Sequence, residues 1–268
     1  AKTVAIVDDK TAYGEGLASE FKKSAIAAGV KVVADEYTDD KAVDFKAILT
    51  KIKGKKPDLI FYGGMDPQAA PMAKQMKELG ITARLLMGDG GCTTEFVKNA
   101  GEAAEGHYCS LPGIPYEKMP GGPKFIERFK AKYGEIQLYA PYAYDAVMVV
   151  VEAIKRAQSA ESAKILAELP KTDYQGVTTR ITFDENGDLK DGAVSLYVAS
   201  GGKWVALDTI GGVAPPAQAA GMGGMSGMAG MAGMVGMAGM GGMAGMAAGM
   251  AGMAGAAASS ARPGDKKK

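Results

Sequence analysis

The chain has 268 residues, with 31 lysines and arginines against 30 aspartates and glutamates. The segment after Gly212 holds four of the basic and one of the acidic residues, so residues 1–212 carry 27 basic and 29 acidic side chains. This balance excludes the charge pattern of a nucleic-acid-binding protein and gives no attraction to an anionic membrane, so we expect neither as a partner.

Apolar strands alternate with helices through the first hundred residues. Glycines close the first two expected helices, at Gly29 and Gly54. Four strands that alternate with helices predict a parallel, doubly wound α/β sheet with right-handed crossovers. The expected strands are residues 3–7, 30–34, 59–62 and 81–87, and the expected helices are residues 13–28, 43–52, a helix from Pro67 onward, and 94–100.

The third strand and the turn after it are the centre of this pattern. Residues 59–62 form a continuous apolar run, which is typical of a parallel strand buried on both faces. Gly63 and Gly64 follow, and then Asp66 and Pro67 have the order of a helix N-cap and first helical residue. Ligands of open α/β sheets bind at the carboxyl ends of the strands. The glycine pair therefore marks a candidate site, although a tight turn without any ligand favours the same residues.

The pattern loosens after His107. Residues 111–123 contain four prolines and are expected to be a loop or crossing segment. Helices are expected at 124–133, 139–157 and 162–169, and the apolar run 147–151 indicates a helix buried by more than one layer. Strands at 180–183, 194–198 and 204–207, with Asn-Gly and Gly-Gly turns between them, predict a C-terminal β-meander.

No catalytic or metal-binding pattern is present. His107 is the only histidine, and there is no Gly-x-Ser-x-Gly motif, P-loop or complete Gly-x-Gly-x-x-Gly. The Asp-rich segment 184–188 has Leu189 where a calcium loop needs glycine, so a hairpin turn is the better interpretation. Cys92 and Cys109 can pair if their strands are adjacent, or remain small buried apolar groups. We expect no catalytic residue, metal or cofactor.

The tail, residues 213–268, is a low-complexity segment. No charged residue occurs from 213 to 261, and eleven methionines recur in Gly-Met-x triplets from 221 to 254. A period of three does not give an apolar stripe on an α-helix, and glycine disfavours helix by about 1 kcal/mol per residue relative to alanine. We expect disorder and no membrane insertion. The repeat resembles the Gly-Gly-Met tail of chaperonins. Its thioethers are also soft ligands, so the alternative function is an interaction or Cu(I)-binding protein that acts through the tail.

Five sequence blocks, in order over residues 1 to about 207, resemble one family. It comprises the solute-binding proteins of branched-chain amino acid ABC transporters, the leucine/isoleucine/valine-binding type with the type I periplasmic binding fold. The blocks are AIVDDKTAYGEGLA (5–18), KKPDLIFYGGMDPQA (55–69), MGDGGCTTE (87–95), QLYAPYAYDAVMV (137–149) and ITFDENGDLKDGA (181–193).

The resemblance implies a binding protein and not an enzyme. In this family a cleft between two lobes closes on one amino acid and presents the closed shape to a membrane permease, without making or breaking a bond. The implied location is the periplasm. No signal peptide is visible before the first strand, so we expect that it has been removed or that the chain begins inside a longer protein.

The resemblance also implies which residues contact the ligand. Tyr13 is at a position where the family places a tyrosine against the ligand; otherwise it is a surface tyrosine. Met65, after Gly64, is where some relatives have an aromatic residue in the side-chain pocket; otherwise it belongs to the core. Asp89 is expected to bind the α-ammonium, although some relatives have a glutamate at the position of Gly90. Either Tyr139 or Tyr142 is expected to close the pocket.

A departure from the family concerns the first lobe. The family has roughly another lobe ahead of Ala1, which supplies the groups that hold the carboxylate of the amino acid. We therefore expect residues 1–212 to be the second lobe plus the returning helices of the first, in a truncated chain. The helix at 139–157 is expected either to fold back on the sheet or to mark a fragment whose remainder is absent.

Overall fold

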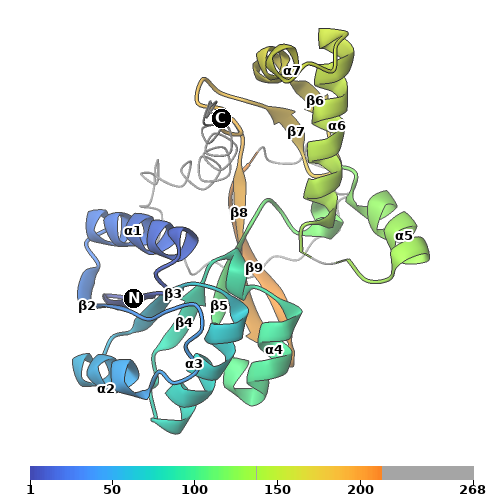
Figure 1. The fold of residues 1–268 in the computed structure, drawn as a ribbon. Coiled ribbons are helices and arrows are strands. Elements are labelled where there is room, and N and C mark those ends of the chain that lie inside the picture. The colour runs from blue at the N-terminus through green and yellow to red at the C-terminus, as the bar shows by residue number, and fades with distance from the viewer. Residues whose placement is uncertain (137, 213–268) are drawn as a thin grey trace, which may run out of the picture.

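A seven-stranded, mostly parallel sheet forms the body of the protein (Figure 1). The structure, a computed structural model, describes residues 1–136 and 138–212. The sheet has the order β2-β1-β3-β4-β5-β8-β9, in which β1 to β5 are parallel and β8 and β9 are antiparallel to their neighbours. Its strands are β1 (Thr3–Asp8), β2 (Lys31–Tyr37), β3 (Leu59–Gly63), β4 (Arg84–Met87), β5 (Tyr108–Pro112), β8 (Ala193–Ser200) and β9 (Lys203–Gly211).

Helices cover both faces of the parallel part (Figure 1). One face of the strands, including Val4, Ile6 and Phe61, packs on α1. Their alternate residues face the larger core under α2, α3 and α4, as the two-residue period of a strand requires. The doubly wound α/β class predicted from the sequence is confirmed. The helices of this part are α1 (Ala12–Ala27), α2 (Lys46–Lys55), α3 (Asp66–Glu78) and α4 (Thr94–Ala100).

The starts of helices α2 and α3 differ from the sequence prediction. Helix α2 begins at Lys46 and includes Gly54, whereas Val43 lies outside it and is 74% exposed. The carboxylates of Asp39 and Asp44 accept backbone N–H groups two residues ahead, and such local bonds compete with the helix. Helix α3 begins one residue earlier than expected, because Asp66 is already helical and Met65 is the N-cap.

The strand β5 was missed because its residues overlap the proline-rich segment. It pairs with β4 on one side and antiparallel to β8 on the other. The expected three-stranded meander is divided between two sheets. Strands β8 and β9 form a hairpin at the edge of the large sheet, whereas β7 (Arg180–Thr182) pairs with β6 (Asp173–Gln175). The open edge of β5 gives β8 a longer partner than the three-residue β7 offers.

A second group of elements stands beside the sheet (Figure 1). Helix α6 (Ala140–Ala157) buries one side, with Asp145, Val149 and Ala153, and it does not fold back on the sheet. The carboxylate of Asp145 accepts hydrogen bonds from the backbone N–H groups of Val177 and Thr178, each 2.8 Å, and from the Thr178 hydroxyl at 2.6 Å. These bonds tie α6 to the segment before β7. The neighbouring helices are α5 (Gly122–Tyr133) and α7 (Ser162–Glu168).

The two cysteines form a disulfide. Cys92, just after β4, is bonded to Cys109 in β5, and both are buried. The adjacency of the two strands thus decides between the two expected states. A bond that closes a loop of 17 residues contributes about 3 kcal/mol to the free energy of unfolding in the chain-entropy treatment.

The helices of the described part of the chain are too short or too polar to cross a membrane. The expectation of a disordered tail concerns residues 213–268, which lie outside the described residues.

His107 is a buried, neutral histidine. Its side chain is 6% exposed, and its Nδ1 accepts a hydrogen bond from the backbone N–H of Leu85 at 3.2 Å. Burial, together with the charge of Arg84, lowers the pKa of His107 to about 4. In the unfolded chain the His107 imidazole takes up a proton near pH 6.5. In the folded chain it does so only near pH 4.

Stability is therefore expected to fall as the pH drops from 6.5 towards 4. The loss assigned to His107 is about 3 kcal/mol in the free energy of unfolding. Urea unfolding at a series of pH values measures it. The control is His107→Asn, whose side-chain oxygen can still accept the Leu85 N–H but does not titrate. An equal loss in the two proteins would contradict this assignment.

Candidate functional site

The site lies where the carboxyl ends of β1, β3 and β4 meet. Tyr13 comes from the first turn of α1, after β1. Gly64 and Met65 follow β3, and Asp89 and Gly90 belong to the short 3-10 helix Asp89–Gly91 after β4. Parallel strands bring these three connections to one edge of the sheet, which is where ligands of open α/β sheets bind.

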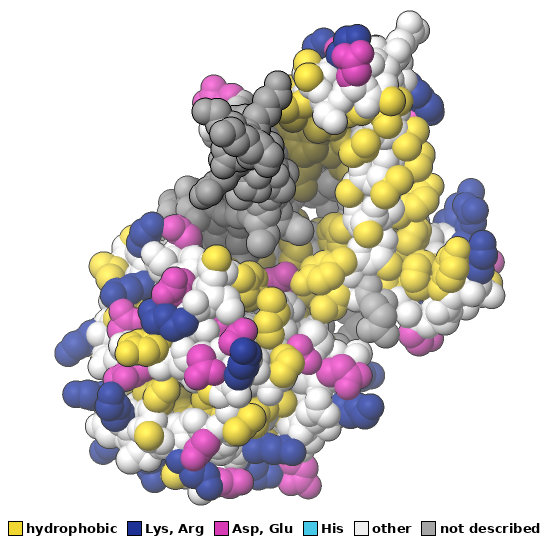
Figure 2. All heavy atoms as spheres, viewed as in Figure 1, with side chains coloured by type: hydrophobic (Ala, Val, Ile, Leu, Met, Phe, Trp, Pro, Cys, Tyr) yellow, Lys and Arg dark blue, Asp and Glu magenta, His cyan; other side chains and the backbone are white. Residues whose placement is uncertain are grey.

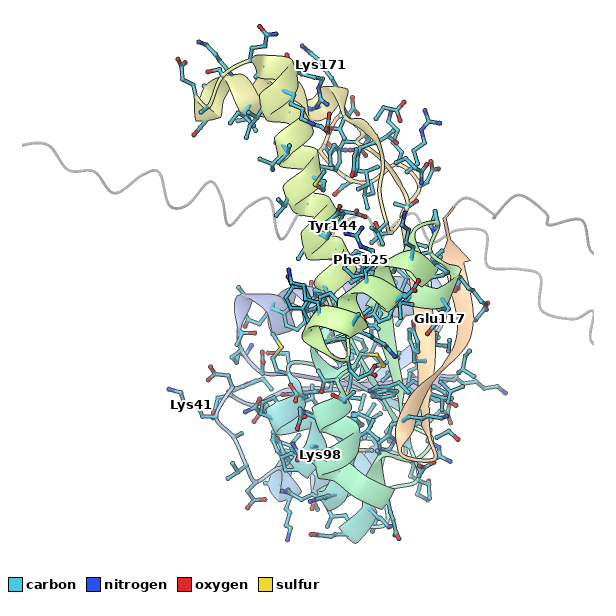
Figure 3. The ribbon with its side chains drawn as sticks, turned by 90° about the vertical axis from the view of Figure 1, so that its right-hand side faces the viewer. Lys41, Lys98, Glu117, Phe125, Tyr144 and Lys171 are labelled. Atoms are coloured by element: carbon cyan, nitrogen blue, oxygen red, sulfur yellow. A yellow bond between two sulfur atoms is a disulfide. The ribbon has the colours of Figure 1, made fainter. Side chains whose placement is uncertain are left out.

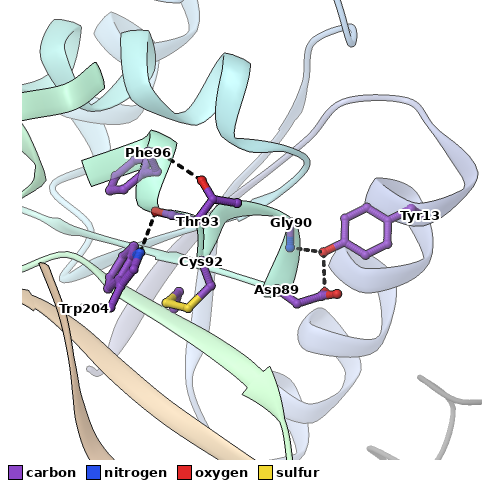
Figure 4. The surroundings of a disulfide bond; sticks show 8 residues. Tyr13, Asp89, Gly90, Cys92, Thr93, Phe96 and Trp204 are labelled. Carbon is purple, nitrogen blue, oxygen red and sulfur yellow. Dashed lines mark hydrogen bonds between the residues drawn. A yellow bond between two sulfur atoms is a disulfide. The ribbon is translucent and has the colours of Figure 1, made fainter. Parts of the chain in front are cut away.

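Asp89 is the polar centre of this edge. Its Oδ1 accepts a hydrogen bond from the Tyr13 hydroxyl at 2.7 Å, and its Oδ2 accepts one from the Tyr139 hydroxyl at 2.6 Å. The Tyr13 hydroxyl in turn accepts the backbone N–H of Gly90 at 3.1 Å (Figure 4). Two phenols from elements 126 residues apart therefore orient one carboxylate.

Both tyrosines are proton donors at neutral pH. Burial raises the pKa of Tyr13, and the negative charge of Asp89 raises it further. Burial, followed by the hydrogen bond to Asp89, likewise raises the pKa of Tyr139. The phenols therefore stay protonated and leave Asp89 as the anionic group of the site. A carboxylate has about four lone-pair positions, so Asp89 can still accept from a cationic ligand group.

Glycine is required at positions 90 and 64 because neighbouring atoms lie too close for a side chain. A Cβ on Gly90 would lie 2.6 Å from the Met65 sulfur, 3.0 Å from the Gly64 carbonyl oxygen and 3.1 Å from the Tyr13 hydroxyl. A Cβ on Gly64 would overlap the ring of Tyr62. The missing side chains let the β3 and β4 connections touch. Met65 is 43% exposed and is therefore a surface residue of the site, not a core methionine.

Tyr139 and Tyr142, between which the sequence did not decide, have different hydrogen-bond partners in the structure. Tyr139, directly before α6, reaches Asp89, whereas the Tyr142 hydroxyl donates to the backbone carbonyl of Pro112 at 2.6 Å. Tyr142 thus fastens α6 to the end of β5. Tyr139 thus lies at the same edge of the sheet as the other residues expected from the sequence, which are Tyr13, Gly64, Met65, Asp89 and Gly90.

An aromatic group beside Tyr139 was missed. The Tyr116 hydroxyl donates to the backbone carbonyl of Leu138, and burial raises the pKa of Tyr116 to about 12. Tyr116, Tyr142 and Tyr197 line a small recess together with Tyr139. Tyr116 lies in the segment interpreted as a loop and Tyr197 in the expected meander. Neither position carried a signal that placed it near the other.

Two buried oxygen atoms near the site were also not foreseen. The Asp9 Oδ2 and the Tyr62 hydroxyl have no hydrogen-bond partner among the described residues. Burial and the charge of Asp9 raise the pKa of Tyr62, so this phenol is neutral as well. Residues 1–136 and 138–212 contain no group of three or more histidine, cysteine or acidic side chains that could hold a metal ion.

The connection that carries Asp89 is held from its far side (Figure 4). The Cys92–Cys109 disulfide joins it to β5, and the Trp204 indole on β9 donates to the Thr93 carbonyl at 2.9 Å. The Thr93 hydroxyl accepts the backbone N–H of Phe96 and so caps α4. Asp89 is thus presented on a connection fixed to two strands and a helix, and a preorganised carboxylate loses little entropy when it binds.

The fold and the site together define a class, the ligand-binding proteins with a doubly wound lobe. A match to the family described as periplasmic binding protein covers residues 1–203. The chain belongs to the periplasmic binding protein family.

Within the family, the chain is similar to proteins named for branched-chain amino acids. It is 34% identical over 197 residues to the leucine-, isoleucine-, valine-, threonine- and alanine-binding protein of Pseudomonas aeruginosa, covering 73% of this chain and 52% of that protein. The solved leucine-binding protein of Thermotoga maritima superposes with a TM-score of 0.74 at 32% identity, covering 78% of this chain and 61% of that one.

A second solved structure carries a ligand. The branched-chain amino acid transporter substrate-binding protein of Streptococcus pneumoniae, in complex with isoleucine, matches with a TM-score of 0.69 at 30% identity, over 79% of this chain and 60% of that one. The chain spans about half the length of the curated relatives it matches.

Proposed function

We propose that this chain binds aliphatic α-amino acids of the leucine, isoleucine and valine class as the substrate-binding component of an ABC transporter. The observation that carries the proposal is the oriented carboxylate of Asp89, held by Tyr13 and Tyr139 at the carboxyl edge of the sheet. A carboxylate fixed by two neutral donors suits the α-ammonium of an amino acid, because a charge-assisted bond is the stronger kind.

The surroundings of Asp89 support an apolar ligand side chain. Met65 presents a thioether beside Gly90, and a flexible, polarisable sulfur adapts to branched aliphatic groups. Uncharged aromatic rings lie on the side of Tyr139. The names of the similar proteins from Pseudomonas aeruginosa and Thermotoga maritima support the same class of ligand.

The role in transport follows from the family. The chain acts in the periplasm, changes no covalent bond of its ligand and delivers the amino acid to a membrane permease. The site contributes one anionic contact and apolar contacts, which are the means of selective binding and not of catalysis.

Saturable binding of leucine tests the proposal. In equilibrium dialysis with labelled leucine, isoleucine and valine are expected to compete, whereas lysine and glutamate are not, because the apolar side of the site offers no partner for a second charge. The matched control is 4-methylpentanoate, which is leucine without its ammonium group. Competition by 4-methylpentanoate equal to that of isoleucine, or no saturable binding, would contradict the proposal.

A further inference from the structure

The connection that carries Asp89 has little rigidity of its own. It reads Gly88-Asp89-Gly90-Gly91, so three of its four residues are glycine. Glycine loses more conformational freedom on folding than any other residue. Two backbone hydrogen bonds span the segment, from Gly91 to the Gly88 carbonyl at 3.1 Å and from Cys92 to the Asp89 carbonyl at 3.0 Å. The position of the Asp89 backbone must therefore be fixed largely from outside the segment.

Stiffer residues cannot take the place of these glycines. A Cβ on Gly88 would lie 2.5 Å from the Cδ2 of Leu17 and 2.8 Å from the Tyr13 hydroxyl, and one on Gly91 would lie 2.6 Å from the sulfur of Met87. The close packing that brings the phenol onto the carboxylate thus requires glycine on both sides of it. The same packing therefore brings a flexible backbone to the site.

Two anchors follow directly after the glycines. Cys92 is disulfide-bonded to Cys109 of β5, and the Thr93 carbonyl accepts the Trp204 indole N–H at 2.9 Å (Figure 4). Cys92 and Cys109 are 2% and 0% exposed, and the Trp204 ring stacks on that of Phe96 with centroids 5.5 Å apart. Both anchors are therefore packed into the body of the protein.

The anchors reach different strands of the same sheet. Cys109 lies opposite Tyr197 of β8, and Trp204 of β9 lies opposite Ala199 of β8. A connection held at one point could still pivot about that point. A connection held at both β5 and β9 cannot, because the hydrogen bonds of β8 fix the two strands relative to each other.

Negative charge alone does not select an ammonium group here. Acidic side chains are spread over the visible face of the body that contains the sheet (Figure 2), and exposed ion pairs contribute little. Asp89 differs from them because Tyr13 and Tyr139 orient its two oxygens. A displacement of the backbone by about 1 Å would disturb both hydrogen bonds and the geometry that the ligand meets.

We propose that the Cys92–Cys109 disulfide and Trp204 are positioning residues that determine the preference of the site for an ammonium group. They touch no ligand. They fix the glycine-rich connection, so that the Asp89 carboxylate faces the ammonium in the geometry that gives a strong bond. Their loss weakens ammonium recognition and spares the apolar contacts at Met65. This role rests on the binding of amino acids at Asp89 proposed above.

Hydrogen exchange without any ligand tests the positioning directly. The Gly90 N–H donates to the Tyr13 hydroxyl, so its exchange rate reports whether the connection stays in place. This amide is expected to exchange roughly tenfold faster in the double variant Cys92→Ala, Cys109→Ala, and also in Trp204→Phe. Phenylalanine at 204 keeps an aromatic ring and removes only the indole donor.

Two control variants separate positioning from general stability. Ile52 is fully buried near the end of α2 that leads into the start of β3, so it lies towards the opposite edge of the sheet. Ile52→Ala lowers the free energy of unfolding about as much as loss of the disulfide and is expected to leave Gly90 exchange unchanged. Lys98→Ala changes a side chain that is 75% exposed on α4 (Figure 3) and is also expected to have no effect.

Two exchange results would overturn the proposal. The first is native exchange of Gly90 in the cysteine variant. The second is equal acceleration in the cysteine variant and in Ile52→Ala, which would show that the disulfide acts only through the stability of the whole fold.

Ligand preference provides the second readout. Leucine is expected to bind roughly tenfold more weakly to the cysteine variant and to Trp204→Phe, whereas the affinity for 4-methylpentanoate is expected to stay unchanged. An equal loss for both ligands would contradict a role in ammonium recognition. Absence of leucine binding to the native chain would instead contradict the proposed function, and the Gly90 exchange would still decide whether the anchors position Asp89.

Discussion

Replacement of Asp89 by asparagine is expected to weaken leucine binding by roughly 100-fold, or about 3 kcal/mol. The asparagine keeps the size of the side chain but removes its charge. Its single acceptor oxygen can face only one of the two phenols, and its NH₂ group then points a donor at the other, although both tyrosines are donors to Asp89 in the native protein. The leucine ammonium then has no anion to face.

The ligand without an ammonium group separates loss of charge from loss of structure. The native protein is expected to prefer leucine over 4-methylpentanoate, and Asp89→Asn is expected to abolish this preference. Isothermal titration of both ligands against both proteins gives the coupling. The matched control is Glu95→Gln, which neutralises an exposed carboxylate on α4 close in sequence to the site. Asp89→Asn with native affinity and native preference would remove Asp89 from the site.

The parallel part of the fold could be predicted from the sequence, because the local residue pattern there agrees with the way the whole sheet packs. Continuous apolar runs such as residues 59–62 can be satisfied only between two layers of helices, and glycines mark the turns. The prediction failed where a local hydrogen bond overrides the helical pattern of apolar residues. The Asp44 carboxylate, for example, accepts the Lys46 N–H, and α2 begins only at Lys46. The pairing of strands far apart in the sequence also could not be predicted. Nothing in residues 108–112 alone indicates that residues 194–198 pair with them.

The sequence predicted that the candidate residues lie at one edge of the sheet, but it did not predict the hydrogen bonds between them. The strand ends placed Tyr13, Met65 and Asp89 at one edge, and the family resemblance assigned each a role. Tyr139 and Tyr142 are three residues apart, so only the path of α6 relative to the sheet decides which hydroxyl reaches Asp89. The state of Cys92 and Cys109 likewise depended on the pairing of β4 with β5.

Gly14→Ala is expected to lower the free energy of unfolding by about 3 kcal/mol, whereas Gly16→Ala, on the same helix, is expected to raise it by up to about 1 kcal/mol. A Cβ on Gly14 would overlap the Asp9 carboxylate and lie 2.5 Å from the carbonyl oxygen of Gly63, whereas one on Gly16 would meet nothing within 4 Å. Alanine at 16 therefore gains only helix propensity.

The clash at Gly14 reaches both the helix cap and the site. The Asp9 carboxylate that must move accepts the Thr11 N–H and hydroxyl, and Thr11 caps α1 through the Gly14 N–H. Gly63 is backbone of the central strand β3 and cannot yield without disturbing the sheet. Because Tyr13 precedes Gly14, displacement of α1 also moves the phenol away from Asp89, and leucine affinity is expected to fall together with stability. Urea unfolding followed by the fluorescence of Trp204 measures the first effect and calorimetric titration the second. Stabilisation by both alanines would show that α1 and β3 do not approach as closely as this packing requires.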